Sequence, residues 1–253
     1  MSVEWEQDGK PRRGPSWPQL VDEAIRLLGV SDPALLRARG TDLQIMEYFR
    51  VVKGSFAPLT NWLVRNMRPP DEALRVSVIH KALAELERCL LVYTTNYDDF
   101  LERSFELHGR RCRSIAVEAD IAHQASGDVV EVVKFHGDLD HPDEMVVSER
   151  NYEVRLKLQH AMDYRLRSDL LGRALLFIGY SFSDWNVAYL FRLANEQFAG
   201  LPNTLAARRA YITVADPSEF EYRLFSERNI EVIPIRGSHQ SEDVAALLQD
   251  LRR

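Results

Sequence analysis

The chain has 253 residues, of which 45% are hydrophobic and 28% charged, with a formal charge of −6 at pH 7. This balance is typical of a globular protein. The negative net charge argues against nonspecific nucleic-acid binding. No apolar run reaches the roughly 20 residues of a membrane-spanning helix. The acidic N-terminus is unlike a secretory signal. We therefore expect a cytoplasmic protein. The two cysteines, Cys89 and Cys112, exclude a disulfide framework and a four-cysteine zinc site within these residues, and we expect no metal.

The first third of the chain is dominated by helical patterns. Residues 1–16 show no apolar period and contain several glycines and prolines, which predicts a flexible lead-in. Apolar residues recur at helical spacing in residues 17–28. From 42 to 90 the pattern is helical throughout, with breaks at Pro58 and at Pro69-Pro70. We interpret this stretch as a small helical module that packs over a sheet.

Beyond residue 90 the pattern changes to short runs that are rich in β-forming residues. These runs span residues 90–94, 113–117, 129–135, 175–180, 211–214 and 230–235. Several are apolar throughout, as expected for strands buried on both faces. Helical patterns separate most of them, including one over residues 187–198, and another over 244–251 closes the chain. The alternation predicts an α/β fold with a doubly wound, mostly parallel sheet over residues 17–253.

Polar residues follow two of these runs in the middle of the chain. Thr95, Asn96 and Asp98 lie where the first predicted strand turns into a helix, and such a junction offers backbone N–H groups to phosphate or ribose oxygens. The alternative is an ordinary strand end whose polar residues cap the helix. His136 and Gly137 follow another strand. His136 is the best candidate for proton transfer, because imidazole titrates near neutrality and a strand end beside glycine predicts access.

Two later strand ends add candidates for ligand binding. Gly179 would let a ligand approach the backbone, and the hydroxyl of Ser181 suits a phosphate or sugar. Asp184 is equally well explained as a cap of the following helix. Asp216 offers a carboxylate of the kind that binds ribose hydroxyls, although a turn before Pro217 is the favoured interpretation.

Several segments together resemble a known family. They are residues 14–20, 80–86, 93–102, 134–137 and 177–184, and the strings Thr-Thr-Asn-Tyr-Asp (94–98) and Gly-Tyr-Ser-Phe-Ser-Asp (179–184) are the most specific. In this order they resemble the sirtuin-like NAD-hydrolase domains of bacterial antiphage defence systems, with coverage from about residue 14 to 235.

The resemblance implies a Rossmann-like, NAD-binding fold that releases nicotinamide and ADP-ribose. It implies that Asn96 positions a water or the ribose at the glycosidic bond and that His136 acts as base or ribose-hydroxyl partner. Asp98 would border the nicotinamide pocket, and Gly179 with Ser181 would lie against the adenosine side. Such a site works mainly by placing polar groups around an oxocarbenium-like state.

Two departures from the family pattern qualify these expectations. Deacylase sirtuins hold a structural zinc on four cysteines, so NAD-dependent protein deacylation is only a minor alternative. The family also opens with a strand and a Gly-Ala-Gly-x-Ser phosphate loop, whereas residues 7–13 read Gln-Asp-Gly-Lys-Pro-Arg-Arg. A truncated start, a substitute segment and a degenerate domain all remain open.

We therefore predict an NAD glycohydrolase effector of a bacterial defence system. We expect its turnover to require a longer N-terminus or a protein partner, and a homo-oligomer is compatible with the pattern. The alternative is a noncatalytic sensor or scaffold that binds NAD or ADP-ribose.

Overall fold

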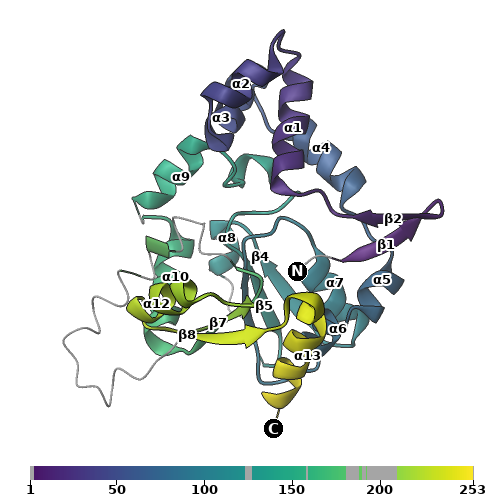
Figure 1. Cartoon of the computed structure of the whole chain (residues 1–253), viewed down its shortest axis with the longest axis vertical. Helices are drawn as coiled ribbons and strands as arrows, with labels where there is room; N and C mark the ends of the chain where they lie inside the picture. The colour runs from purple at the N-terminus through teal and green to yellow at the C-terminus, as the bar shows by residue number, and fades with distance from the viewer. Residues whose placement is uncertain are drawn as a thin grey trace. The chain divides into compact units, whose positions relative to one another are not determined.

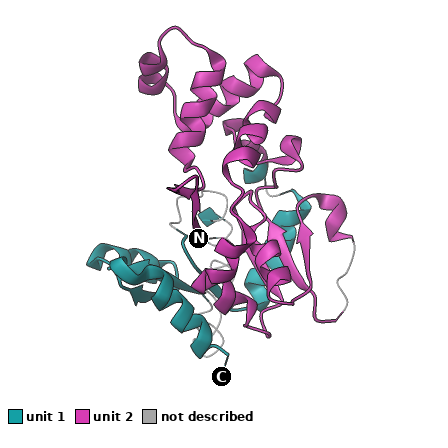
Figure 2. Cartoon of the chain, turned by 90° about the vertical axis from the view of Figure 1, so that its right-hand side faces the viewer, with its two compact units in different colours: residues 1, 155–253 teal, residues 2–154 magenta. Residues whose placement is uncertain are grey.

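The chain divides into two compact units, Ser2–Val154 and Arg155–Arg253 (Figures 1 and 2). The computed structural model describes residues 3–122, 127–157, 159–180, 188–189, 192 and 210–252. Each unit contains a three-stranded sheet in which every pairing is parallel. The predicted α/β class with parallel strands is thereby confirmed.

The first unit begins with an antiparallel hairpin of β1 (Glu4–Gln7) and β2 (Lys10–Arg13). Its two turn residues, Asp8 and Gly9, have φ values of 54° and 68°. An Asp-Gly pair favours such a turn because both residues tolerate the left-handed region. Regular structure thus occupies part of the flexible lead-in predicted for residues 1–16. The strands carry no hydrophobic alternation because nearly all of their side chains are exposed.

Helices follow the hairpin without an intervening strand. They are α1 (Trp17–Leu28), α2 (Pro33–Arg39), α3 (Asp42–Lys53), α4 (Ala57–Asn66), α5 (Asp71–Val76) and α6 (Val78–Ala84). The helical pattern predicted from residue 42 is confirmed. Its breaks match the structure, because Pro58 lies in the first turn of α4 and Pro70 directly precedes α5.

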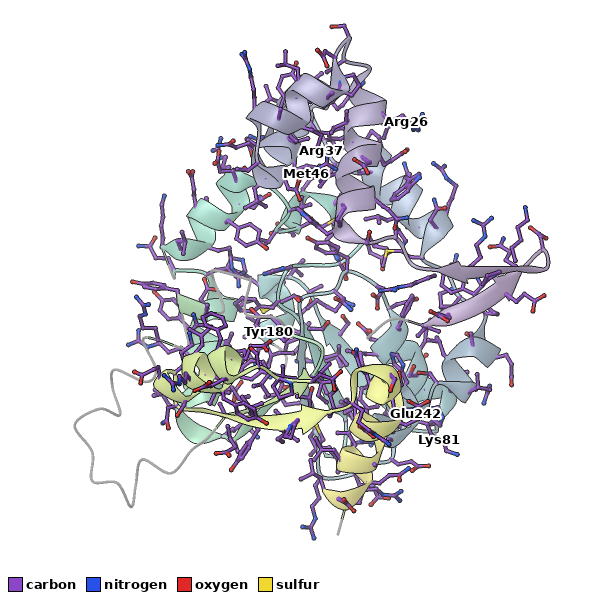
Figure 3. All side chains as sticks on the ribbon, viewed as in Figure 1. Arg26, Arg37, Met46, Lys81, Tyr180 and Glu242 are labelled. Atoms are coloured by element: carbon purple, nitrogen blue, oxygen red, sulfur yellow. The ribbon has the colours of Figure 1, made fainter. Side chains whose placement is uncertain are left out.

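One hydrophobic core joins α1, α3 and α4, and we call these three helices the helical module. Met46 of α3 is fully buried in this core, whereas Arg26 projects from the outer face of α1 (Figure 3). Met145 and Val147, which follow the last strand of this unit, belong to the same core. By contrast, α5 and α6 contact α7 (Phe100–Leu107). The helices of the module therefore begin before residue 42 and end at Asn66, well before residue 90.

The sheet of the first unit consists of β3 (Leu91–Thr94), β4 (Cys112–Ile115) and β5 (Val130–Lys134), in the order β3-β5-β4. Helix α8 (Glu118–Ile121) follows β4, and the 3₁₀ turn η1 (Pro142–Glu144) follows β5. Val132 and Val133 point to opposite faces of the central strand and are both fully buried. This explains why β5 carries adjacent apolar residues instead of a strict apolar–polar alternation.

The second unit carries the later predicted strands. Helix α9 (Glu149–Leu156) spans the boundary between the units, and the elements beyond it are α10 (Ala161–Gly172), β6 (Leu175–Phe177), β7 (Ala210–Ala215), α12 (Glu219–Glu227), β8 (Ile230–Ile235), η2 (Gly237–His239) and α13 (Gln240–Asp250). The strand order is β6-β7-β8. The predicted C-terminal helix corresponds to α13, while the helix predicted over 187–198 lies mostly outside the described residues. None of the helices in the described part of the chain is long and apolar enough to cross a bilayer.

A buried histidine lies on α6, the helix that contacts α7. His80 is 2% exposed, and its Nδ1 lies 2.8 Å from the hydroxyl of Ser77. Burial lowers the pKa of His80 to about 4, because the charged imidazolium would lose its hydration. His80 is therefore neutral in the folded protein at pH 7.

We predict that the protein loses stability as the pH falls below about 6.5. Unfolded His80 takes up a proton near its ordinary pKa, whereas folded His80 stays neutral down to about pH 4. The unfolded state then binds the extra proton, which costs up to about 1.4 kcal/mol for each pH unit within this window. Urea unfolding at pH 7 and pH 5 measures the loss. We expect a smaller pH-dependent loss in His80→Gln, and equal losses in the two proteins would contradict the assignment.

Candidate functional site

The carboxyl ends of β3 and β5 bring two polar turns to the same edge of the first unit's sheet. Thr94 pairs with Lys134 in the parallel register, and the amide of Phe135 donates to the carbonyl oxygen of Thr94 at 2.8 Å. The segment 95–99, here called the Asn96 turn, therefore leaves the sheet beside the segment 135–138, the His136 turn. Five of the predicted site residues lie in these turns, namely Thr95, Asn96, Asp98, His136 and Gly137.

The Asn96 turn contains both exposed and buried polar side chains. Asn96 is exposed, and its amide N–H donates to Thr94 Oγ1 at 3.1 Å. Asp98 is 8% exposed, and its Oδ1 accepts from the amide of Phe100 at 3.2 Å, where α7 begins. Burial raises the pKa of the Asp98 carboxyl, and the nearby Lys134 ammonium opposes this shift. Asp98 thus supports the start of α7, and Asn96 is available to a ligand.

His136 differs from the expectation of an accessible side chain, because only 3% of it is exposed. Its ring centroid lies 5.6 Å from that of Tyr152 in an edge-on arrangement and 5.8 Å from that of Phe135. Tyr152 comes from α9, which sequence reasoning could not place beside the end of β5. The expectation that His136 is accessible was therefore wrong, because Tyr152 of α9 packs against its imidazole.

Gly137 is required by the close packing of the His136 turn. Its φ is +78°, and a Cβ at this position would lie 3.0 Å from the carbonyl oxygen of Glu144. Its amide also donates to the carbonyl oxygen of Lys134 at 2.9 Å. Any other residue would strain the backbone and push the chain after η1 away.

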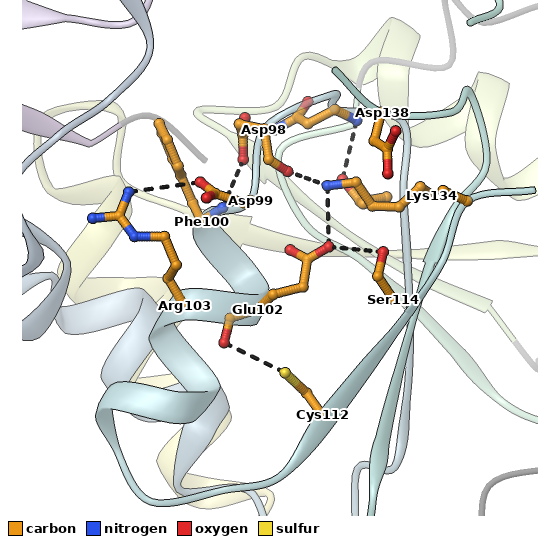
Figure 4. A network of polar contacts seen from close by, with 12 residues as sticks. Asp98, Asp99, Phe100, Glu102, Arg103, Cys112, Ser114, Lys134 and Asp138 are labelled. Atoms are coloured by element: carbon orange, nitrogen blue, oxygen red, sulfur yellow. Dashed lines mark hydrogen bonds and ion pairs between the residues drawn. The ribbon is translucent and has the colours of Figure 1, made fainter. Parts of the chain in front are cut away.

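Lys134, the buried last residue of β5, directly precedes the His136 turn and contacts the Asn96 turn with its side chain (Figure 4). The side chain of Lys134 is 1% exposed; its ammonium donates to the carbonyl oxygen of Asp98 and lies 3.3 Å from Glu102 Oε1. Ser114 donates its hydroxyl to the same carboxylate oxygen at 3.2 Å. Burial raises the pKa of Glu102, and Lys134 opposes the shift. No role of Lys134 or Glu102 was predicted from the sequence, although a charged residue at the end of an apolar strand is a usable signal.

The remaining predicted residues belong to the second part of the chain. Gly179 is exposed with φ +65°, two residues beyond the end of β6. Asp216 has φ +44°, and its Oδ2 accepts from the amide of Gly237 at 3.1 Å. Binding of a ribose by this carboxylate stays a prediction. Ser181 and Asp184 lie outside the described residues. A shared crevice of Gly179 with Asn96 and His136 stays a prediction.

The described residues show no metal-binding arrangement. Among them, no group of three or more His, Cys, Asp or Glu side chains could hold a metal ion. Cys89 and Cys112 are both free thiols. The chemistry that the described edge of the sheet offers is that of an exposed amide, a buried imidazole and fixed backbone dipoles.

We predict that Lys134→Met lowers the free energy of unfolding by about 3 kcal/mol, because it leaves the buried carboxylate of Glu102 without its cation. Arg111→Met is the matched control. It breaks the ion pair with Asp128, in which the two side chains are 71% and 83% exposed, so water replaces the lost partner. Urea denaturation at pH 7 compares the variants. Equal losses of unfolding free energy in the two variants would contradict the prediction.

Comparison with known proteins matches residues 90–233, more than half of the chain, to the model of a SIR2-like domain. The NAD(+) hydrolase ThsA of Bacillus cereus (strain MSX-D12) is 34% identical over 184 residues, which cover 68% of this chain and 38% of the relative. ThsA of Enterococcus faecium is 28% identical over 174 residues, covering 68% and 35%. Defense-associated sirtuin 2 of Bacillus subtilis is 26% identical over 184 residues, covering 70% and 17%. The chain spans less than two fifths of the length of these relatives.

Proposed function

Because this chain belongs to the family of SIR2-like domains, we propose that it binds NAD and hydrolyses the bond between nicotinamide and ribose. The resemblance inferred from the sequence motifs is confirmed by the family match. The observation that carries the proposal is the similarity to proteins named NAD(+) hydrolase. Asn96 and His136 both lie within residues 90–233, which match the SIR2-like domain model. The adjacent parallel strand ends that carry these two residues support it.

The proposed reaction consumes one water and releases nicotinamide, ADP-ribose and a proton. The exposed amide of Asn96 is suited to orient the water or the ribose at the scissile carbon. The imidazole of His136 is suited to accept the proton or to bond a ribose hydroxyl. Because His136 is 3% exposed, we assign the first contact with NAD to Asn96 and expect His136 to act from the inner side of the site. Thr95 and Gly137 complete the edge, and no metal takes part in the proposal.

We further propose that the protein acts as an effector of a bacterial defence system. The name of Defense-associated sirtuin 2 supports this role. NAD is abundant in the cytoplasm, which we propose as the site of action. The chain covers only part of the lengths of its relatives. We also propose that the protein acts together with a partner protein or with further copies of the same chain.

A second candidate function is a noncatalytic module that binds NAD or ADP-ribose. The hairpin of β1 and β2 favours it, since exposed strands occupy the position where the resembled family has a buried strand and a glycine-rich phosphate loop. Without that loop the diphosphate lacks a cradle of backbone N–H groups. Quantifying nicotinamide release beside NAD binding distinguishes the two candidates, because the module would bind without release. Protein deacylation stays a minor alternative.

We predict that NAD or ADP-ribose stabilises the folded chain. A ligand that binds only the folded state, at 100 times its dissociation constant, adds about 2.7 kcal/mol. Thermal melts across a ligand titration measure this effect, with nicotinic acid as a control that lacks the adenosine and diphosphate groups. A melting temperature that stays constant at millimolar NAD and ADP-ribose would argue against a binding site.

We also predict that Asn96→Ala lowers nicotinamide release about 100-fold, because the ribose or water loses the group that orients it. The assay uses an active preparation, either this chain or a longer gene product that contains it. Asn61→Ala is the matched control, since Asn61 is an exposed asparagine on α4. His136→Gln tests the imidazole while filling most of the buried space, and a similar loss is expected. Turnover near that of the unmodified protein in either site variant would refute its assigned role.

A further inference from the structure

We infer that Tyr97 is a positioning residue that holds the Asn96 turn at a set distance from the His136 turn. The inference rests on the proposed function for its catalytic consequence, but its structural basis is independent of it. Tyr97 lies between Asn96 and Asp98 in the Asn96 turn. It reaches the other turn through the backbone of a third segment, residues 145–148, which we call the strap.

Two hydrogen bonds to one strap residue form the bridge. The hydroxyl of Tyr97 donates to the carbonyl oxygen of Val146 at 2.8 Å. The amide of Val146 donates to the carbonyl oxygen of His136 at 3.0 Å. A single peptide segment therefore contacts the residue beside Asn96 and the backbone of His136. Displacing Val146 would move one turn relative to the other.

The strap is fixed because its apolar side chains are part of the core of the helical module. Met145 and Val147 are 2% and 1% exposed and belong to that core. The ring of Tyr97 packs against the same core. The hydroxyl of Tyr97 thus extends from a side chain that the module already holds in place, so its bond to Val146 requires little additional ordering.

Polar contacts fix the end of the strap. Ser148 donates its hydroxyl to Glu47 Oε2 of α3 at 2.6 Å, and its amide donates to Asn151 Oδ1 of α9 at 3.0 Å. Arg50, one turn further along α3, forms an ion pair with Glu47 at 2.5 Å and, with Ser148, lowers the pKa of that carboxyl. Glu47 therefore stays ionised at neutral pH and remains an acceptor for Ser148. The helical module consequently determines where the strap lies.

This arrangement assigns the helical module a role in the geometry of the site. Lys134 connects the two turns from the inner side, and the Tyr97–Val146–His136 bridge connects them through the strap. A misplacement of about 1 Å between reacting groups can reduce turnover on the order of 100-fold. Losing the hydroxyl of Tyr97 should affect the placement of Asn96 more than NAD affinity, because other parts of the dinucleotide contribute to binding.

Tyr97→Phe tests the inference, since it removes only the hydroxyl and keeps the ring in the core. Tyr48→Phe is the matched control, because Tyr48 lies on α3 with 45% of its surface exposed. In an active preparation we expect Tyr97→Phe to lower kcat by about 10-fold or more, with a KM for NAD close to the original value. Tyr48→Phe should change neither constant. A loss confined to KM, or an unchanged kcat, would overturn the inference.

Hydrogen exchange gives a second readout that needs no enzymatic activity. Without NAD, peptides that cover residues 145–148 and 95–98 should exchange faster in Tyr97→Phe than in the unmodified protein or in Tyr48→Phe. Exchange elsewhere, including β5, should be unchanged, which separates local loosening from general destabilisation. Unchanged exchange in both segments would overturn the bridge. If neither this chain nor the longer gene product with its partner releases nicotinamide while Tyr97→Phe accelerates this exchange, the proposed hydrolase is refuted and the bridge stands.

Discussion

The ammonium of Lys134, enclosed at the end of the central strand β5, is the constraint on which the first unit's polar edge depends. A charge in this position must be neutralised, and the carboxylate of Glu102 and the carbonyl oxygen of Asp98 supply its partners. Both partners come from the segment that follows β3. The requirement to solvate one lysine therefore fixes where α7 begins and where the chain bearing Asn96 leaves the sheet.

The strap, residues 145–148, provides a second connection between the two turns at this edge of the sheet. There the strap combines apolar anchors in the core of the helical module with hydrogen bonds to both turns. The core supplies most of the stability through burial, whereas the directional bonds decide the distance between the turns. The proposed catalysis by an amide and an imidazole depends on that distance more than on overall stability, because it relies on placement of groups around a developing charge.

The hairpin of β1 and β2 is the feature that most separates this chain from the family pattern. The residue that precedes it, Val3, is buried in a small core with Leu74 of α5 and Phe100 of α7. Phe100 is also the residue whose amide donates to Asp98. The base of the hairpin is thus attached to the helix that follows the Asn96 turn, while its strands remain exposed. A segment anchored in this way is a structural neighbour of the proposed site even though it provides no glycine-rich loop.

The sequence by itself determined the strands around residues 90–94, 130–134 and 230–235 and the helices of the first third, because apolar period and proline breaks are local signals. It also located Asn96 and His136 at strand ends, since polar residues stop an apolar run. Only the tertiary structure decided that His136 is covered by Tyr152 and that Lys134 is paired with Glu102. Those outcomes depend on which distant segments pack together, and a buried or exposed environment cannot be read from residues whose neighbours lie tens of positions away.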